Sequence, residues 1–122
     1  MTRRTLFAAL AFMSLAVSSC TSNGDATTTV EVVSTDKECR VAATQAPVGT
    51  ITFDVRNDGN DVTEFYLYDE DGAKVVGEVE NIGPGVTRSM VVEAVVGSYE
   101  TACKPGMAGD GIRAAFEVVD TG

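Results

Sequence analysis

The chain of 122 residues contains no histidine. This absence excludes nucleophilic catalysis of the Ser-His and Cys-His kinds, because both use an imidazole as the general base. It also excludes an ordinary blue-copper centre, which takes two imidazoles and one thiolate as ligands. Carboxylates are plentiful, but nothing in their spacing marks out one acid–base pair. We therefore predict that the protein is not an enzyme.

Positive charge is scarce, with nine Lys and Arg against 18 Asp and Glu and a net charge of −9. Such a chain should be repelled by nucleic acid and attracted to cations, so a metal ion or a basic partner is the favoured ligand class. A well-solvated surface explains the acidity equally well. The acidic stretches at 57–61 and 69–72 lack the full spacing of a calcium loop, and we interpret both as tight turns.

An apolar run at 6–17, preceded by Arg3 and Arg4, has the length of a signal peptide and is too short for a membrane span. It is followed by Val-Ser-Ser-Cys, which resembles the lipobox of bacterial lipoproteins. We predict a signal peptide over 1–19, lipidation of Cys20, a flexible polar tether over 20–27 and an extracytoplasmic, membrane-anchored location. Ordinary cleavage near Ser19 is the alternative. The general secretory and twin-arginine export routes both stay open.

The cysteine count then leaves one pair for the folded domain. If Cys20 carries lipid, Cys39 and Cys103 remain outside the reducing cytoplasm, where two thiols form a disulfide or bind a metal. A disulfide closing so long a loop would stabilise the fold by about 4 kcal/mol in the loop-entropy description. The residues alone leave both alternatives open.

Helical periodicity is missing after residue 27, and short β-rich runs separated by turn signals take its place. We predict an all-β Greek-key sandwich of about eight strands over residues 28–122. The six clearest runs, followed by two shorter ones, are Thr27–Ser34, Thr50–Asn57, Val62–Asp69, Val86–Ala94, Ser98–Cys103, Ile112–Asp120, Arg40–Ala43 and Val75–Val79.

The stretch YETACKPGM, residues 99–107, has the form of a cupredoxin copper loop without its histidine. Together with TDKECRV, VTEFYLYDEDG and VVGEVENIGPGVTRSM, it resembles the cupredoxin-like domain of the EfeO family of bacterial iron-uptake proteins. The resemblance runs from about Val30 to Val119 and implies a cupredoxin-like fold. Family members usually continue into a helical imelysin or peptidase-like domain with a His-x-x-Glu motif. We expect this chain to lack that domain, which favours an accessory metal-handling role.

The same resemblance implies a ligand set in which cysteines and carboxylates replace the histidines and hold copper or ferric iron. Thiolates suit copper(I), whereas carboxylates suit a hard ferric ion. Carried over by position, the implied ligands are Cys39, Cys103, Glu64, Glu78, Glu80 and, as a weak thioether ligand, Met107. For the glutamates and the methionine, ordinary surface and packing roles are the alternative.

Two functions follow from these observations. The first is a lipid-anchored metal-binding module that assists iron uptake or envelope redox chemistry, with an iron-uptake permease or a peroxidase-type protein as partner. The second is a non-metal interaction domain of the envelope in which Cys39 and Cys103 form a disulfide.

Overall fold

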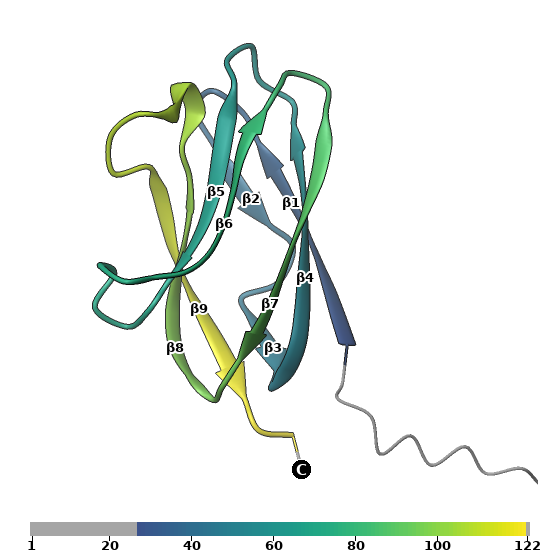
Figure 1. The fold of residues 1–122 in the computed structure, drawn as a ribbon, viewed down its shortest axis with the longest axis vertical. Helices are drawn as coiled ribbons and strands as arrows, with labels where there is room; N and C mark the ends of the chain where they lie inside the picture. Colours follow the sequence, from purple (N-terminus) through teal and green to yellow (C-terminus); the bar gives the residue numbers. More distant parts are fainter. Residues whose placement is uncertain (1–26, 122) are drawn as a thin grey trace, which may run out of the picture.

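Two β-sheets packed face to face form the protein in the computed structural model, which describes residues 27–121 (Figure 1). The elements are β1 (Thr27–Ser34), β2 (Cys39–Val41), β3 (Gln45–Pro47), β4 (Gly49–Asn57), β5 (Thr63–Tyr68), β6 (Val75–Ile82), β7 (Thr87–Ala94), β8 (Gly97–Cys103), the 3₁₀ turn η1 (Pro105–Met107) and β9 (Ile112–Val119). Within residues 27–121, no helix is long and apolar enough to cross a membrane.

The strand order is β2-β1-β4-β7 in one sheet and β3-β9-β8-β5-β6 in the other. The β1–β4 and β3–β9 pairs are parallel and the remaining pairs are antiparallel. The predicted all-β sandwich is therefore confirmed. The prediction missed β3, because three residues ending at Pro47 carry no alternation and Pro47 itself reads as a turn signal.

Alternation along the strands builds the core between the sheets. In β4, Ile51, Phe53 and Val55 are fully buried, while Thr52 and Asp54 between them are partly exposed. Phe53 lies 5.2 Å from Phe65 and 5.4 Å from Phe116, measured between ring centroids. These rings come from both sheets, so burying them in one cluster holds the two layers together.

Polar contacts also tie the layers together. The hydroxyls of Ser34 and Thr63 lie 2.8 Å apart in the buried space between β1 and β5. The Asn57 side-chain amide donates to the backbone carbonyls of Asp61 and Ile82, at 2.7 and 2.8 Å. Among the described residues, no buried side-chain nitrogen or oxygen lacks a hydrogen-bond partner. The end of the sandwich that carries the loop after β4 is thus firmly held.

Candidate functional site

The cysteine pair lies inside the sandwich as a disulfide. Cys39 of β2 is bonded to Cys103 of β8, with 5.5 Å between the two Cα atoms. The bond joins one sheet to the other, and Cys103 is fully buried. A disulfide sulfur is not a thiolate, so the intact bond leaves neither cysteine available as a copper(I) ligand.

The predicted acidic ligands lie on the outer face of the five-stranded sheet, whereas Cys103 lies on its inner face. Phe65 and Cys103 pair across β5 and β8 and face the core. Because side chains alternate along a strand, Glu64 and Tyr66 face outward. Glu78 of β6 is exposed and pairs with Tyr66. The structure therefore separates the cysteines from the carboxylates by the thickness of one sheet.

Two carboxylates converge on the hydroxyl of Tyr66. Glu64 Oε2 lies 3.0 Å and Glu80 Oε1 lies 3.1 Å from the Tyr66 oxygen, which is the donor to both. The hydroxyl carries only one proton, so it cannot fully satisfy two acceptors. Glu64, Tyr66 and Glu80, which we call the oxygen triad, therefore present three oxygen atoms that share a single hydrogen.

The electrostatics of the oxygen triad keep Tyr66 protonated. Burial, followed by the hydrogen bonds to Glu64 and Glu80, raises the pKa of Tyr66 far above its ordinary value of 10.0. Burial and the neighbouring carboxylates both disfavour a negative phenolate. A cation bound between the three oxygens would reverse this preference, because it would attract the phenolate charge.

A stacked pair of tyrosines supports the oxygen triad. The rings of Tyr66 and Tyr68 are 5.5 Å apart and nearly parallel. Lys104 Nζ lies 4.3 Å from the centroid of the Tyr66 ring, and the Arg113 guanidinium lies 4.2 Å from that of Tyr68. Lys104 Nζ also lies 5.7 Å from the Tyr68 centroid, so both cations lie over the tyrosine pair and help to keep β5 buried on both sides. The stack and its two cations fix the position of the Tyr66 hydroxyl.

Met107 lies in η1, which begins two residues after the end of β8, and the residue is 43% exposed. Within residues 27–121, no group of three or more His, Cys, Asp or Glu side chains is placed to hold a metal ion. The oxygen triad contains only two such side chains, Glu64 and Glu80, and its third oxygen comes from the phenol of Tyr66. The sequence did not single out Tyr66 as a ligand, although the alternation in TEFYLY places residues 64, 66 and 68 on one face.

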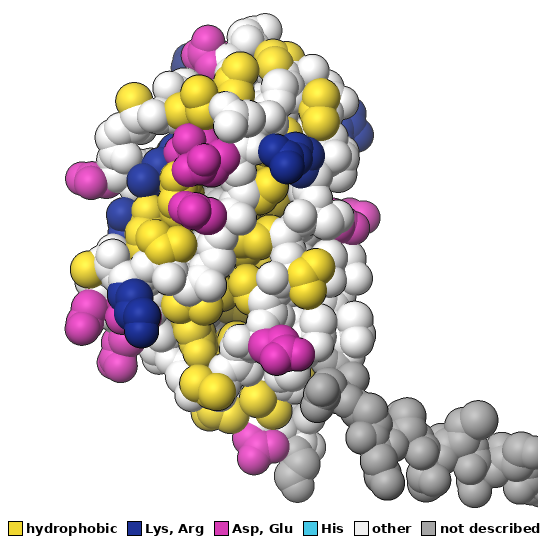
Figure 2. Space-filling model, viewed as in Figure 1, with side chains coloured by type: hydrophobic (Ala, Val, Ile, Leu, Met, Phe, Trp, Pro, Cys, Tyr) yellow, Lys and Arg dark blue, Asp and Glu magenta, His cyan; other side chains and the backbone are white. Residues whose placement is uncertain are grey.

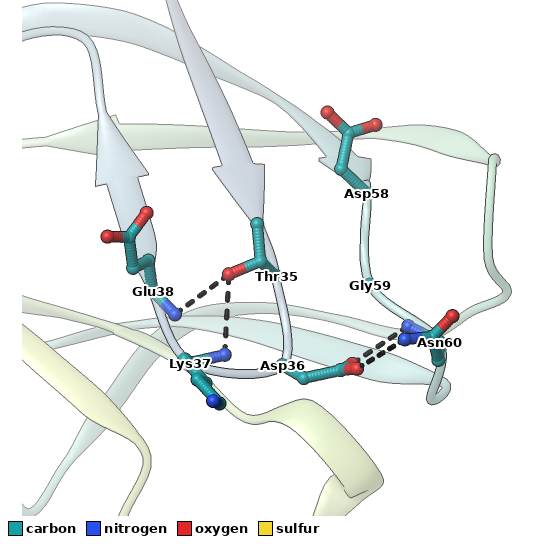
Figure 3. A pocket seen from close by; sticks show the side chains of 7 residues that line it. All are labelled: Thr35, Asp36, Lys37, Glu38, Asp58, Gly59 and Asn60. Atoms are coloured by element: carbon teal, nitrogen blue, oxygen red, sulfur yellow. Dashed lines mark hydrogen bonds between the residues drawn. The ribbon is translucent and has the colours of Figure 1, made fainter.

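A second acidic region lines a hollow at the loops after β1 and β4 (Figure 3). Asp36 accepts hydrogen bonds from the backbone N–H groups of Asn60 and Asp61 and from the Asn60 amide. These bonds, the backbone bond from Asn60 first, lower the pKa of Asp36. The carboxylates of Glu38 and Asp58 point away from Asp36, so the three acids do not converge on one point. The role of Asp36 here is to hold the two loops together through its hydrogen bonds.

We expect the oxygen triad to make the protein less stable as the pH becomes alkaline. The unfolded chain releases the Tyr66 proton above about pH 10, whereas the native protein retains it because the folded pKa is raised. The free energy of unfolding should therefore fall as the pH rises above about 10. Urea denaturation between pH 8 and 11 should show a smaller fall for Tyr66→Phe, while Tyr99→Phe, outside the triad, should behave like the wild type. Equal slopes in all three proteins would contradict the assignment.

Comparisons with known proteins agree with this fold. Residues 6–115 match the family described as the cupredoxin-like domain. Reduced auracyanin from Roseiflexus castenholzii aligns with 79% of this chain and 99% of its own, at a TM-score of 0.59 and 17% identity. An azurin from Methylomonas sp. strain J aligns with 75% of this chain and 98% of its own, at a TM-score of 0.58 and 13% identity. At these identities the two structures support the fold alone.

The chain belongs to the cupredoxin-like domain family. Over 74 residues it is 34% identical to the iron uptake system component EfeO of Yersinia pseudotuberculosis, and the same holds for that of Yersinia pestis. It is therefore a cupredoxin-like domain of the EfeO type, as the sequence motifs predicted. The match covers 61% of this chain and 19% of each EfeO protein, so the chain spans only a small part of these relatives.

Proposed function

We propose that the protein is a lipid-anchored, extracytoplasmic module that binds ferric iron as cargo and assists iron uptake. The convergence of Glu64, Glu80 and Tyr66 carries this proposal. Carboxylate and phenolate oxygens are hard donors, and a ferric ion is a hard acceptor. The likeness to the iron-uptake component EfeO supports iron as the metal. Binding and delivery, rather than catalysis, is the role that follows.

Copper is the weaker candidate for this chain. A blue-copper site needs two imidazoles, and the sequence has no histidine. Copper(I) would need thiolates, which Cys39 and Cys103 supply only after their disulfide has been reduced. The oxygen triad needs no such step. Ferric iron therefore suits the donors that the folded domain presents.

Ferric titration of Glu64→Gln tests the site. The substitution keeps the shape of the side chain but removes one negative ligand, so ferric affinity should fall about tenfold or more, while the melting temperature changes little. Because the ligands compete with protons, wild-type affinity should also fall as the pH drops. Glu70→Gln, in the exposed turn after β5, is the matched control for general attraction by an acidic surface. Equal losses in both variants, each abolished by moderate salt, would mean that no specific site exists.

The predicted lipid anchor gives a second test. Cys20 lies outside the described residues, and its proposed lipidation rests on the lipobox-like sequence before it. Cys20→Ala should release the protein into the soluble envelope or medium fraction and abolish labelling by a lipid precursor. Cys39→Ala, which leaves Cys20 in place, should remain in the membrane fraction. Extraction of Cys20→Ala by detergent alone would contradict the anchor.

The partners proposed for this module are those of a cargo carrier at the membrane. A permease that takes up iron, or a peroxidase-type protein that changes its oxidation state, would receive the ferric ion from the oxygen triad. The triad suits such a transfer because it lies on the outer face of the five-stranded sheet. A partner can therefore approach the metal without opening the core.

A further inference from the structure

One end of the sandwich carries exposed valines where polar turn residues are usual. Val95 and Val96 form the connection between β7 and β8, and these residues are 73% and 54% exposed. Val48, between β3 and β4, is also exposed and lines a shallow hollow with Val95. Connections of this kind normally use Gly, Asn, Asp, Pro or Ser. Three exposed valines at neighbouring connections therefore suggest an apolar contact surface.

The described chain begins at this same end. Thr27 of β1 pairs with Thr50, and Gly49 of β4 pairs with Ala94, so the start of β1 and the end of β7 flank the start of β4. We call this the tether end. In Figure 1 it is the lower end of the sandwich, and Figure 2 shows hydrophobic side chains gathered there.

The length of the preceding segment limits which surface can face the bilayer. Residues 20–26 span at most about 25 Å when fully extended. β4 alone, with nine residues, is about 30 Å long. The opposite end of the sandwich could reach the bilayer only if the tether were stretched along nearly the whole sheet. A lipid on Cys20 therefore favours contact through the tether end.

From these observations we infer that Val48, Val95 and Val96 dock the domain onto the lipid bilayer that holds Cys20. This inference rests on the lipid anchor of the proposed function. Three valines bind a bilayer weakly, but the short tether keeps them at a high effective concentration beside it. Glu93 lines the same hollow and is repelled by anionic headgroups, so the fitting surface is zwitterionic. Docked in this way, the domain keeps the loops after β4 and β6 pointing away from the membrane.

The chain contains no tryptophan, which makes a single introduced indole an unambiguous probe. Val95→Trp places the probe at the tether end. Val86→Trp places it at the opposite end, before β7, where Val86 is also an exposed valine in a connection. The pair therefore controls for the intrinsic affinity of tryptophan for membranes.

The experiment couples the mature chain, residues 20–122, through the thiol of Cys20 to a maleimide-bearing lipid in phosphatidylcholine vesicles. Cys20 is the free thiol, because Cys39 and Cys103 are bonded to each other. This coupling makes the result independent of whether cells lipidate Cys20, so failure of the anchor and failure of the docking are distinguishable.

In vesicles with brominated acyl chains, we expect the fluorescence of Val95→Trp to shift to shorter wavelength and to be quenched at least twofold. The fluorescence of Val86→Trp should not change, and anionic vesicles should quench Val95→Trp less. Quenching of neither probe in vesicle-bound protein would overturn the docking, as would quenching of Val86→Trp alone. A blue shift of Val95→Trp without bromine quenching would show that a second copy or another part of the chain covers the valines, and would also overturn it.

Discussion

Replacing Cys39 with serine should lower the free energy of unfolding by about 2–5 kcal/mol. The Cys39–Cys103 bond joins β2 of one sheet to β8 of the other and closes a loop with a sequence separation of 64. Without the bond the unfolded chain gains conformational freedom, and Cys103 stays fully buried as an unpaired thiol. Urea denaturation of the purified domain, with and without the substitution, measures this loss.

Cys20→Ser is the matched control for the disulfide, because it removes a cysteine that precedes the described residues and should leave the unfolding curve unchanged. An intact mass lower than that of the reduced chain by two hydrogen atoms would support the bond in the purified protein. A wild-type domain with two reactive thiols at positions 39 and 103, and a stability equal to that of Cys39→Ser, would contradict it.

Most of the fold could be predicted because the strands of a sandwich carry their own alternation. The run Thr27–Ser34 is β1 as predicted, and the run at Thr50–Asn57 differs from β4 by one residue. Both strands have one face in the core and one toward solvent, so apolar and polar residues alternate along them. β3 has three residues and pairs only with β9, so its position depends on tertiary contacts rather than on local pattern.

The arrangement of the candidate site could not be predicted in the same way. The family resemblance implied that Glu64, Glu80 and Cys103 are ligands of one site, and they do come from three adjacent strands, because β5 lies between β6 and β8. Which face each side chain occupies depends on strand register, and a shift of one residue reverses the face. The pairing of Phe65 with Cys103 places the sulfur in the core and Glu64 outside.

Tyr66 could not be identified as a site residue from the sequence, because its role also depends on strand pairing. Its neighbours in the sequence favour ordinary strand packing, and the ring is indeed buried against Tyr68. Only the pairing of β5 with β6, with a register shift between Thr63 and Phe65, brings Glu80 to the Tyr66 hydroxyl. A bulge of this kind leaves no signal in composition or periodicity. The oxygen triad is therefore a product of tertiary structure.

Ferric iron bound to the oxygen triad should produce a visible colour. Ferric phenolates absorb visible light by transfer of charge from the phenolate to the metal, whereas ferric carboxylates absorb there only weakly. Binding must displace the Tyr66 proton, which the native protein otherwise holds tightly because its pKa is raised. Titration should therefore release a proton as the absorption grows. Copper(II) should not give the intense blue absorption of a site with two imidazoles and a thiolate.

The most direct measurement is a titration of the purified domain with ferric citrate, followed by visible absorption, in wild type, Tyr66→Phe and Tyr99→Phe. Tyr99 is the matched control because its hydroxyl donates to the Val95 carbonyl, whereas the Tyr66 hydroxyl donates to Glu64 and Glu80. We expect a saturable band at one ferric ion per domain in wild type and Tyr99→Phe, and no band in Tyr66→Phe. A band that persists in Tyr66→Phe, or no band in the wild-type protein, would contradict a metal site at the oxygen triad.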